Sequence, residues 1–134
     1  MLKWICTAIA CCHAAWALAD SEARGLLKVH DKSEATSYFH AKGYANLGIR
    51  RKDLPSVGQC RLWFPGRPAD MQPPEGNCAR VNRDIPSGAW LIARSTTDPL
   101  HVSVHAYDDQ NPGTVVAIGI FAFETRDFVR YATP

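Results

Sequence analysis

Proline placement sets the strongest limit on how this chain can fold. Six of the nine prolines lie between Leu54 and Pro86, together with three glycines. Proline fixes its backbone φ angle and lacks an N–H, so it cannot donate a hydrogen bond within a sheet. Residues 53–86 are therefore expected to form an ordered, irregular loop with polyproline-like pieces. Such a loop cannot supply a central strand over most of its length.

The N-terminus predicts export from the cytosol. Residues 1–19 (MLKWICTAIACCHAAWALA) hold one early cation, an apolar stretch and an A-x-A ending at Ala19, which is the pattern of a cleaved secretory signal peptide. A membrane anchor is disfavoured because the apolar stretch is shorter than the about 20 residues that span a bilayer. Lipidation at Cys11 is a further alternative, although Ala8 stands where a lipobox usually has Leu. The mature protein is expected to be periplasmic or secreted, with no transmembrane span.

Cleavage at that position would leave Cys60 and Cys78 as the two cysteines of residues 20–134. In an oxidising compartment such a pair predicts one disulfide. The bond would stabilise the fold by about 3 kcal/mol because it restricts the unfolded chain. A redox role is disfavoured, since redox cysteines usually lie two residues apart.

The C-terminal third predicts a mainly β fold, with α+β as the alternative. Residues 89–93 (AWLIA) form a short apolar run, and residues 100–107 (LHVSVHAY) alternate between apolar and polar, as a strand with one buried face does. Residues 115–123 (VVAIGIFAF) are apolar on both faces and suit a central strand, and residues 128–131 (FVRY) return after a hairpin connection. We therefore expect a small antiparallel sheet of about four strands over residues 87–132.

Residues 20–134 have the usual length of a single small domain. Its expected parts are an N-terminal arm over 20–52, the proline-rich cysteine loop over 53–86 and the sheet over 87–132. A short helix is possible in the arm, with Ser33 as its N-cap.

Charge and metal-binding patterns exclude several functions. The formal net charge of +2 does not favour nucleic acid as a partner, because nucleic-acid-binding domains normally present a strongly basic face. No cofactor or metal is expected. His101 and His105 would start roughly 13 Å apart on a strand, too far to share one ion. A weak site at His105 with Asp108 or Asp109 is left as an alternative.

The stretch LPSVGQCRLWFPGRP at residues 54–68, followed by QPP at 72–74 and by Cys78, carries a resemblance. It resembles a family of small exported bacterial proteins and lipoproteins with the pattern LPPxGxCRxWxPGxPxxxQPPxxxC. The segment VVAIGIFAFETRDFVRY is similar to the end of some members. One departure is Ser56-Val57, where a second proline is common. The resemblance implies export and a disulfide, and it brings no activity or cofactor with it.

Aromatic and basic side chains gather inside this stretch, and they allow two interpretations. Arg61, Trp63, Phe64 and Arg67 could form a recognition surface that an ordered loop presents to a peptide, a glycan or an anionic group. Alternatively, Trp63 belongs to a small core under the loop, with the disulfide packed against it.

These observations predict an exported cell-envelope protein with a binding or structural role and no enzymatic one. Its partner would be an envelope protein, a peptide or a glycan. The alternative is a small periplasmic hydrolase acting on wall or peptide material, with His40, His101, His105 and Asp108 as the pool of catalytic groups. That alternative requires some of these side chains to lie within about 4 Å of one another or of a cavity. A secreted stress or metal-homeostasis factor is a third possibility.

Overall fold

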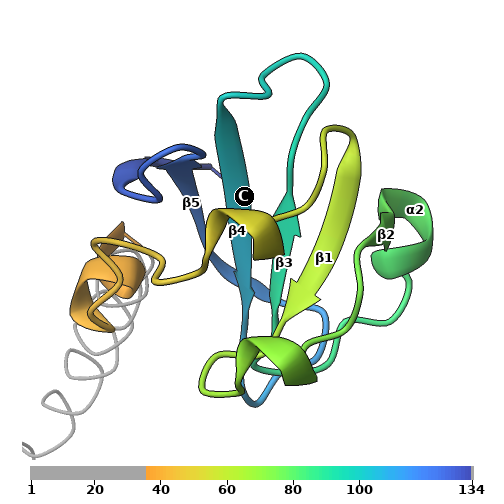
Figure 1. Ribbon diagram of the computed structural model, residues 1–134. Helices are drawn as coiled ribbons and strands as arrows, with labels where there is room; N and C mark the ends of the chain where they lie inside the picture. The colour runs from red at the N-terminus through yellow and green to blue at the C-terminus, as the bar shows by residue number, and fades with distance from the viewer. Residues whose placement is uncertain (1–35, 134) are drawn as a thin grey trace, which may run out of the picture. The chain divides into compact units, whose positions relative to one another are not determined.

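The computed structural model describes residues 36–133, which belong to one compact unit (Figure 1). The expected signal peptide over 1–19, the lipidation alternative at Cys11 and the first part of the arm, residues 20–35, lie outside the described residues. The Ser33 cap lies outside them as well.

A six-stranded sheet forms the body of the molecule, and every neighbouring pair of strands is antiparallel. The order across the sheet is β2-β1-β3-β4-β5-β6. The strands are β1 (Gln59–Trp63), β2 (Gly76–Asn77), β3 (Trp90–Ala93), β4 (His101–Tyr107), β5 (Val115–Ala122) and β6 (Phe128–Ala132). The mainly β, antiparallel fold is therefore confirmed.

The four strands expected over residues 87–132 all form, as a meander from β3 to β6. The alternation along β4 is confirmed, because Val102, Val104 and Ala106 are fully buried while the residues between them are partly exposed. β5 has a neighbour on both sides, although β3 and β4 hold the centre of the sheet.

The expected strand count was low by two, and both additional strands come from the proline-rich stretch. β1 pairs with β3 on one side and with β2 on the other, so it is an interior strand. Its five residues contain no proline, although Pro55 and Pro65 lie on either side of them. Proline thus limits the length of β1 without preventing its pairing. The rest of the stretch is irregular apart from the short helices η2 (Ala69–Met71) and α2 (Cys78–Val81).

The described chain begins in a helical segment over residues 36–41, which Gly43 ends. Gly43 adopts a φ of 83°, and its N–H donates to the carbonyl of His40. The next N–H, of Tyr44, donates to the carbonyl of Phe39 at 2.7 Å. This pair of bonds is the Schellman motif that glycine favours at a helix C-terminus.

The main core lies between one face of the sheet and the segment that precedes β1. Figure 1 shows this segment, with η1 (Arg51–Asp53), crossing in front of the central strands. Phe39 is fully buried, and its ring lies 5.8 Å from that of Trp90 and 5.3 Å from that of Phe121. The core also contains Leu47, Ile49, Leu54, Trp63, Ile92, Val102, Val104, Ala106 and Ala117.

Candidate functional site

The disulfide joins Cys60 and Cys78, as expected. The two sulfur atoms are 2.06 Å apart and the two Cα atoms 4.8 Å apart. Cys60 lies in β1, and Cys78 begins α2 directly after β2. The bond therefore fastens α2 to an interior strand of the sheet, and the residues that follow α2 start from a fixed point.

Trp63 lies in the main core, with 8% of its surface exposed. It is three residues after Cys60 in β1, so the two side chains leave opposite faces of the strand. The disulfide accordingly does not pack on Trp63, and the idea of a separate small core under the loop is wrong in that detail. Trp63 packs instead with the large side chains that the sheet buries.

Arg61 is bound to the backbone of the molecule. Its Nε donates to the carbonyl of Pro73 and its Nη1 to the carbonyl of Asp53, each at 2.8 Å. The guanidinium also lies 5.7 Å from the centre of the Trp63 ring. Arg61 thus ties two irregular segments to β1, and this engagement leaves it less free to meet a partner.

Phe64 and Arg67 are the two predicted contact residues that form a surface feature. Arg67 is exposed, and its guanidinium carbon lies 4.0 Å from the centre of the half-buried Phe64 ring. We call this pair the Arg67–Phe64 stack. Such stacking orients the guanidinium while its N–H donors stay accessible.

Gln72 holds the loop that carries this stack. Its Oε1 accepts from the N–H of Phe64 at 2.7 Å, and its Nε2 donates to the carbonyls of Phe64 and Arg67. Gln72 is 8% exposed and is the one buried polar side chain among the residues that the structure describes. Because a buried amide must be satisfied internally, these bonds set the conformation of residues 64–72.

The histidines of the hydrolase alternative are engaged elsewhere. His40 Nδ1 lies 3.3 Å from the hydroxyl of Tyr131. His101 Nδ1 lies 2.9 Å from a carboxylate oxygen of Asp98, and both side chains are exposed. Neither arrangement brings two members of the proposed catalytic pool together, because Tyr131 and Asp98 are not among them.

Asp108 shapes the turn between β4 and β5. Its Oδ1 accepts from the backbone N–H groups of Gln110 at 2.7 Å and Asn111 at 3.1 Å. These hydrogen bonds, with that from Gln110 the larger influence and that from Asn111 the second, hold the pKa of the Asp108 carboxyl below its usual range. Within residues 36–133, no hydrogen bond joins any two of His40, His101, His105 and Asp108.

His105 lies on the sheet face opposite the main core. Its partners across the sheet are Leu91 in β3 and Ile118 in β5, both buried. Burial lowers the pKa of the His105 imidazole, because desolvation disfavours the charged form. In the described part of the chain, no set of three His, Cys, Asp or Glu side chains is placed to hold a metal ion.

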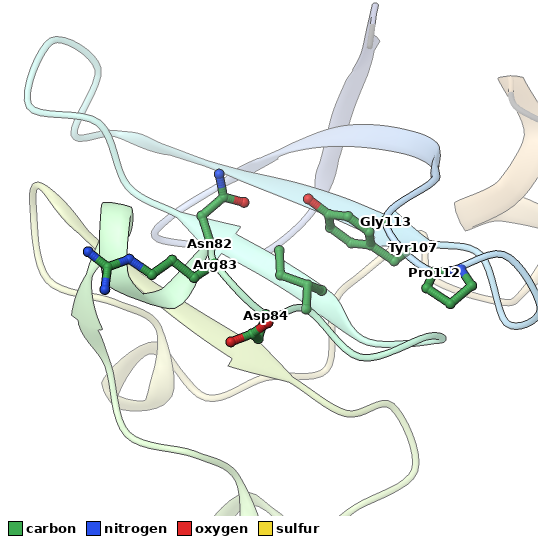
Figure 2. Close-up of a pocket in the computed structure, with 7 residues that line it drawn as sticks. Asn82, Arg83, Asp84, Tyr107, Pro112 and Gly113 are labelled. Atoms are coloured by element: carbon green, nitrogen blue, oxygen red, sulfur yellow. The ribbon is translucent and has the colours of Figure 1, made fainter.

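A pocket of about 430 Å³ opens where the chain leaves α2 (Figure 2). One wall is formed by residues 82–85, directly after α2, and the other by Tyr107 with Pro112 and Gly113. Figure 2 shows the Tyr107 hydroxyl directed toward the side that Asn82 occupies, while the Arg83 and Asp84 side chains extend away from Tyr107. Burial raises the pKa of the Tyr107 phenol.

Sequence reasoning did not identify this pocket. The tripeptide Asn82-Arg83-Asp84 reads as an ordinary polar turn, and Tyr107 as the last residue of an alternating strand. Since β3 and β4 lie next to each other, the chain that enters β3 comes to lie beside the end of β4. No local sequence pattern predicts that residues 82–85 lie beside Tyr107.

None of the helical segments between residues 36 and 133 has the length and hydrophobicity that a bilayer crossing requires. Comparison of the chain with protein-family models, curated proteins and solved structures finds no match. The resemblance of residues 54–78 to small exported bacterial proteins therefore remains a prediction.

Proposed function

We propose that this protein is a non-enzymatic binding module of the cell envelope, exported to the periplasm or beyond. The signal-peptide pattern of residues 1–19 supports export. The Cys60–Cys78 disulfide supports it weakly, because such bonds persist in oxidising compartments. We assign the contact with an envelope protein to the loop of residues 64–72.

The observation that carries this proposal is the buried Gln72 amide and its three bonds to the loop backbone. A loop that is ordered before binding loses little conformational entropy when a partner arrives. The loop also presents the Arg67–Phe64 stack and Met71, which is 66% exposed. Arginine and large apolar side chains are enriched where proteins contact one another.

The Arg67 guanidinium has no carboxylate within ion-pair distance among residues 36–133. Its N–H donors are therefore available for a carboxylate or a carbonyl of the partner. The hydrolase alternative has less support, because its four candidate groups are not hydrogen-bonded to one another in the described chain and do not line the pocket of Figure 2.

Site-specific photocrosslinking in intact cells tests the loop contact. A photoreactive amino acid at Met71 should capture a specific envelope protein, whereas the same group at Leu100 should not. Leu100 is a matched control because it is 68% exposed and precedes β4, at the opposite end of the sheet from the loop. Capture of the same products from both positions would contradict the proposal.

Variants of the stack refine this test. Arg67→Ala should lower the Met71 crosslinking yield by about tenfold, equivalent to about 1.4 kcal/mol. Phe64→Leu should lower it less, since it keeps apolar volume and loses the stacking. Trp63→Ala is a poor probe, because loss of a buried tryptophan costs about 3–5 kcal/mol of stability. An unchanged yield in a folded Arg67→Ala protein would remove the stack from the contact.

A further inference from the structure

We infer that the pocket between residues 82–85 and Tyr107 binds a neutral saccharide. This site lies apart from the 64–72 loop in its lining residues, and the inference does not depend on the contact proposed for that loop. Its volume of about 430 Å³ falls within the range of small-molecule sites.

The first argument is that the polar side chains of the pocket are unused. Asn82, Arg83, Asp84 and Tyr107 make no side-chain hydrogen bond or ion pair to any other residue of the described chain. The side chain of Asn77, at the other end of α2, is by contrast engaged in capping that helix. The Tyr107 hydroxyl and the Asn82 amide lie toward one another across the pocket, and these free polar groups can be satisfied by a ligand or by solvent.

The second argument is the kind of ligand that these groups fit. An amide and a phenol each donate and accept hydrogen bonds, and so does every hydroxyl of a sugar. The lining contains one cation, Arg83, and one anion, Asp84, so neither a strongly anionic nor a strongly cationic ligand is favoured. Ile85, Pro112 and the Tyr107 ring supply apolar surface for the C–H face of a sugar ring.

The third argument is that both walls are fixed before any ligand arrives. The disulfide anchors the start of α2, and Asn82 is the C-cap of that helix. On the other side, the Asp108 carboxylate fixes the turn that leads to Pro112 and Gly113. A site built in this way retains its affinity because little order must be created on binding.

The experiment is a titration of the isotopically labelled full chain, or its cleaved form, followed by amide NMR. The probes are the trimers of glucose and N-acetylglucosamine, the galacturonate trimer and trialanine. At least one neutral trimer should shift the amides of Asn82 and Gly113 in a saturable way. Absence of saturable shifts with both neutral trimers would overturn the inference, and so would tighter binding of the galacturonate trimer or of the peptide.

Variants tie the binding to the pocket. Asn82→Ala should weaken binding by about tenfold, and Tyr107→Phe should weaken it while keeping the ring. The control is Gln110→Ala. Gln110 is exposed and lies in the turn that carries Pro112 and Gly113, but it does not line the pocket. Equal weakening by Gln110→Ala and Asn82→Ala would overturn the assignment. Arg67→Ala should leave the saccharide shifts unchanged, which separates this site from the loop contact.

Discussion

At the scale of single residues, the Phe39 and Phe121 rings approach Gly119 in β5 closely. A Cβ added at Gly119 would lie 2.7 Å from the Phe39 ring and 2.7 Å from the Phe121 ring. Ordinary carbon–carbon contacts are about 3.5–4.0 Å. Glycine is therefore required here by two fully buried rings, that of Phe121 in the same strand and that of Phe39 in the helical segment far away in sequence.

This contact makes a prediction about stability. Gly119→Ala should lower the free energy of unfolding by about 1–3 kcal/mol, because the ring must move in a filled core. Chemical denaturation measures the loss. In a Phe39→Leu background the same substitution should cost less, because Leu leaves room above the strand. An equal cost in both backgrounds would mean that the Phe39 ring is not the obstacle.

His105 predicts how stability depends on pH. Its folded-state pKa lies below the unfolded value of 6.5, so the unfolded chain binds a proton first as the pH falls. The contribution of neutral His105 is complete above pH 6.5 and is lost as the pH falls through the folded pKa. Urea denaturation at pH 7.5 and 5.5 should show lower stability at the acidic pH.

The variant for this prediction is His105→Leu, which should reduce the difference between the two pH values. His40→Gln serves as the control, since it retains His105 and should retain the difference that His105 causes. If His105→Leu leaves the pH dependence unchanged, burial of this imidazole does not control it.

At the scale of elements, Gln72 determines the order of the 64–72 loop. Gln72→Leu would leave the Phe64 N–H without its acceptor and the Arg67 carbonyl without its donor, while the Phe64 carbonyl would keep only the Arg67 N–H. An unsatisfied buried polar group costs about 1–3 kcal/mol. We expect a loss of that size in the free energy of unfolding, together with faster hydrogen exchange at the Phe64 amide. Exchange as slow as in the unmodified chain would show that other contacts hold the loop.

At the scale of the whole molecule, the sheet has two parts that differ in how local their contacts are, and the disulfide lies within one of them, between β1 and α2. β3 to β6 form a meander between sequence neighbours, whereas β1 and β2 add to its edge from the proline-rich region. The double variant Cys60→Ala/Cys78→Ala should lose about 3 kcal/mol of stability. Amide protection should fall first in β1, β2 and α2, and it should persist in β4 and β5. Uniform loss of protection over all six strands would contradict this division.

Export also predicts that the signal peptide of residues 1–19 is removed from the mature protein. Mass spectrometry of protein recovered from the cell envelope should find an N-terminus at Asp20 and a mass lower by two hydrogens than that of the reduced chain. Recovery of the full-length polypeptide from the cytosol, with reduced thiols, would contradict export.

The sequence by itself determined the elements whose signals are local. The alternation of residues 100–107 and the apolar run of residues 115–123 predicted β4 and β5, because side chains of a strand point to opposite faces in turn. The pairing of Cys60 and Cys78 also followed from the sequence, given export.

The tertiary structure decided the features that depend on which distant segments meet. β1 is interior because β3 accepts it as a partner, and proline content alone did not reveal this. From the sequence, Arg61 and Trp63 were candidate surface contacts. In the structure, Arg61 is bound to two backbone carbonyls and Trp63 lies in the main core. The pocket of Figure 2 likewise exists only where the end of α2 meets the end of β4. Hydrogen-bond pairing and burial are properties of distant residues brought together, and a local pattern does not contain them.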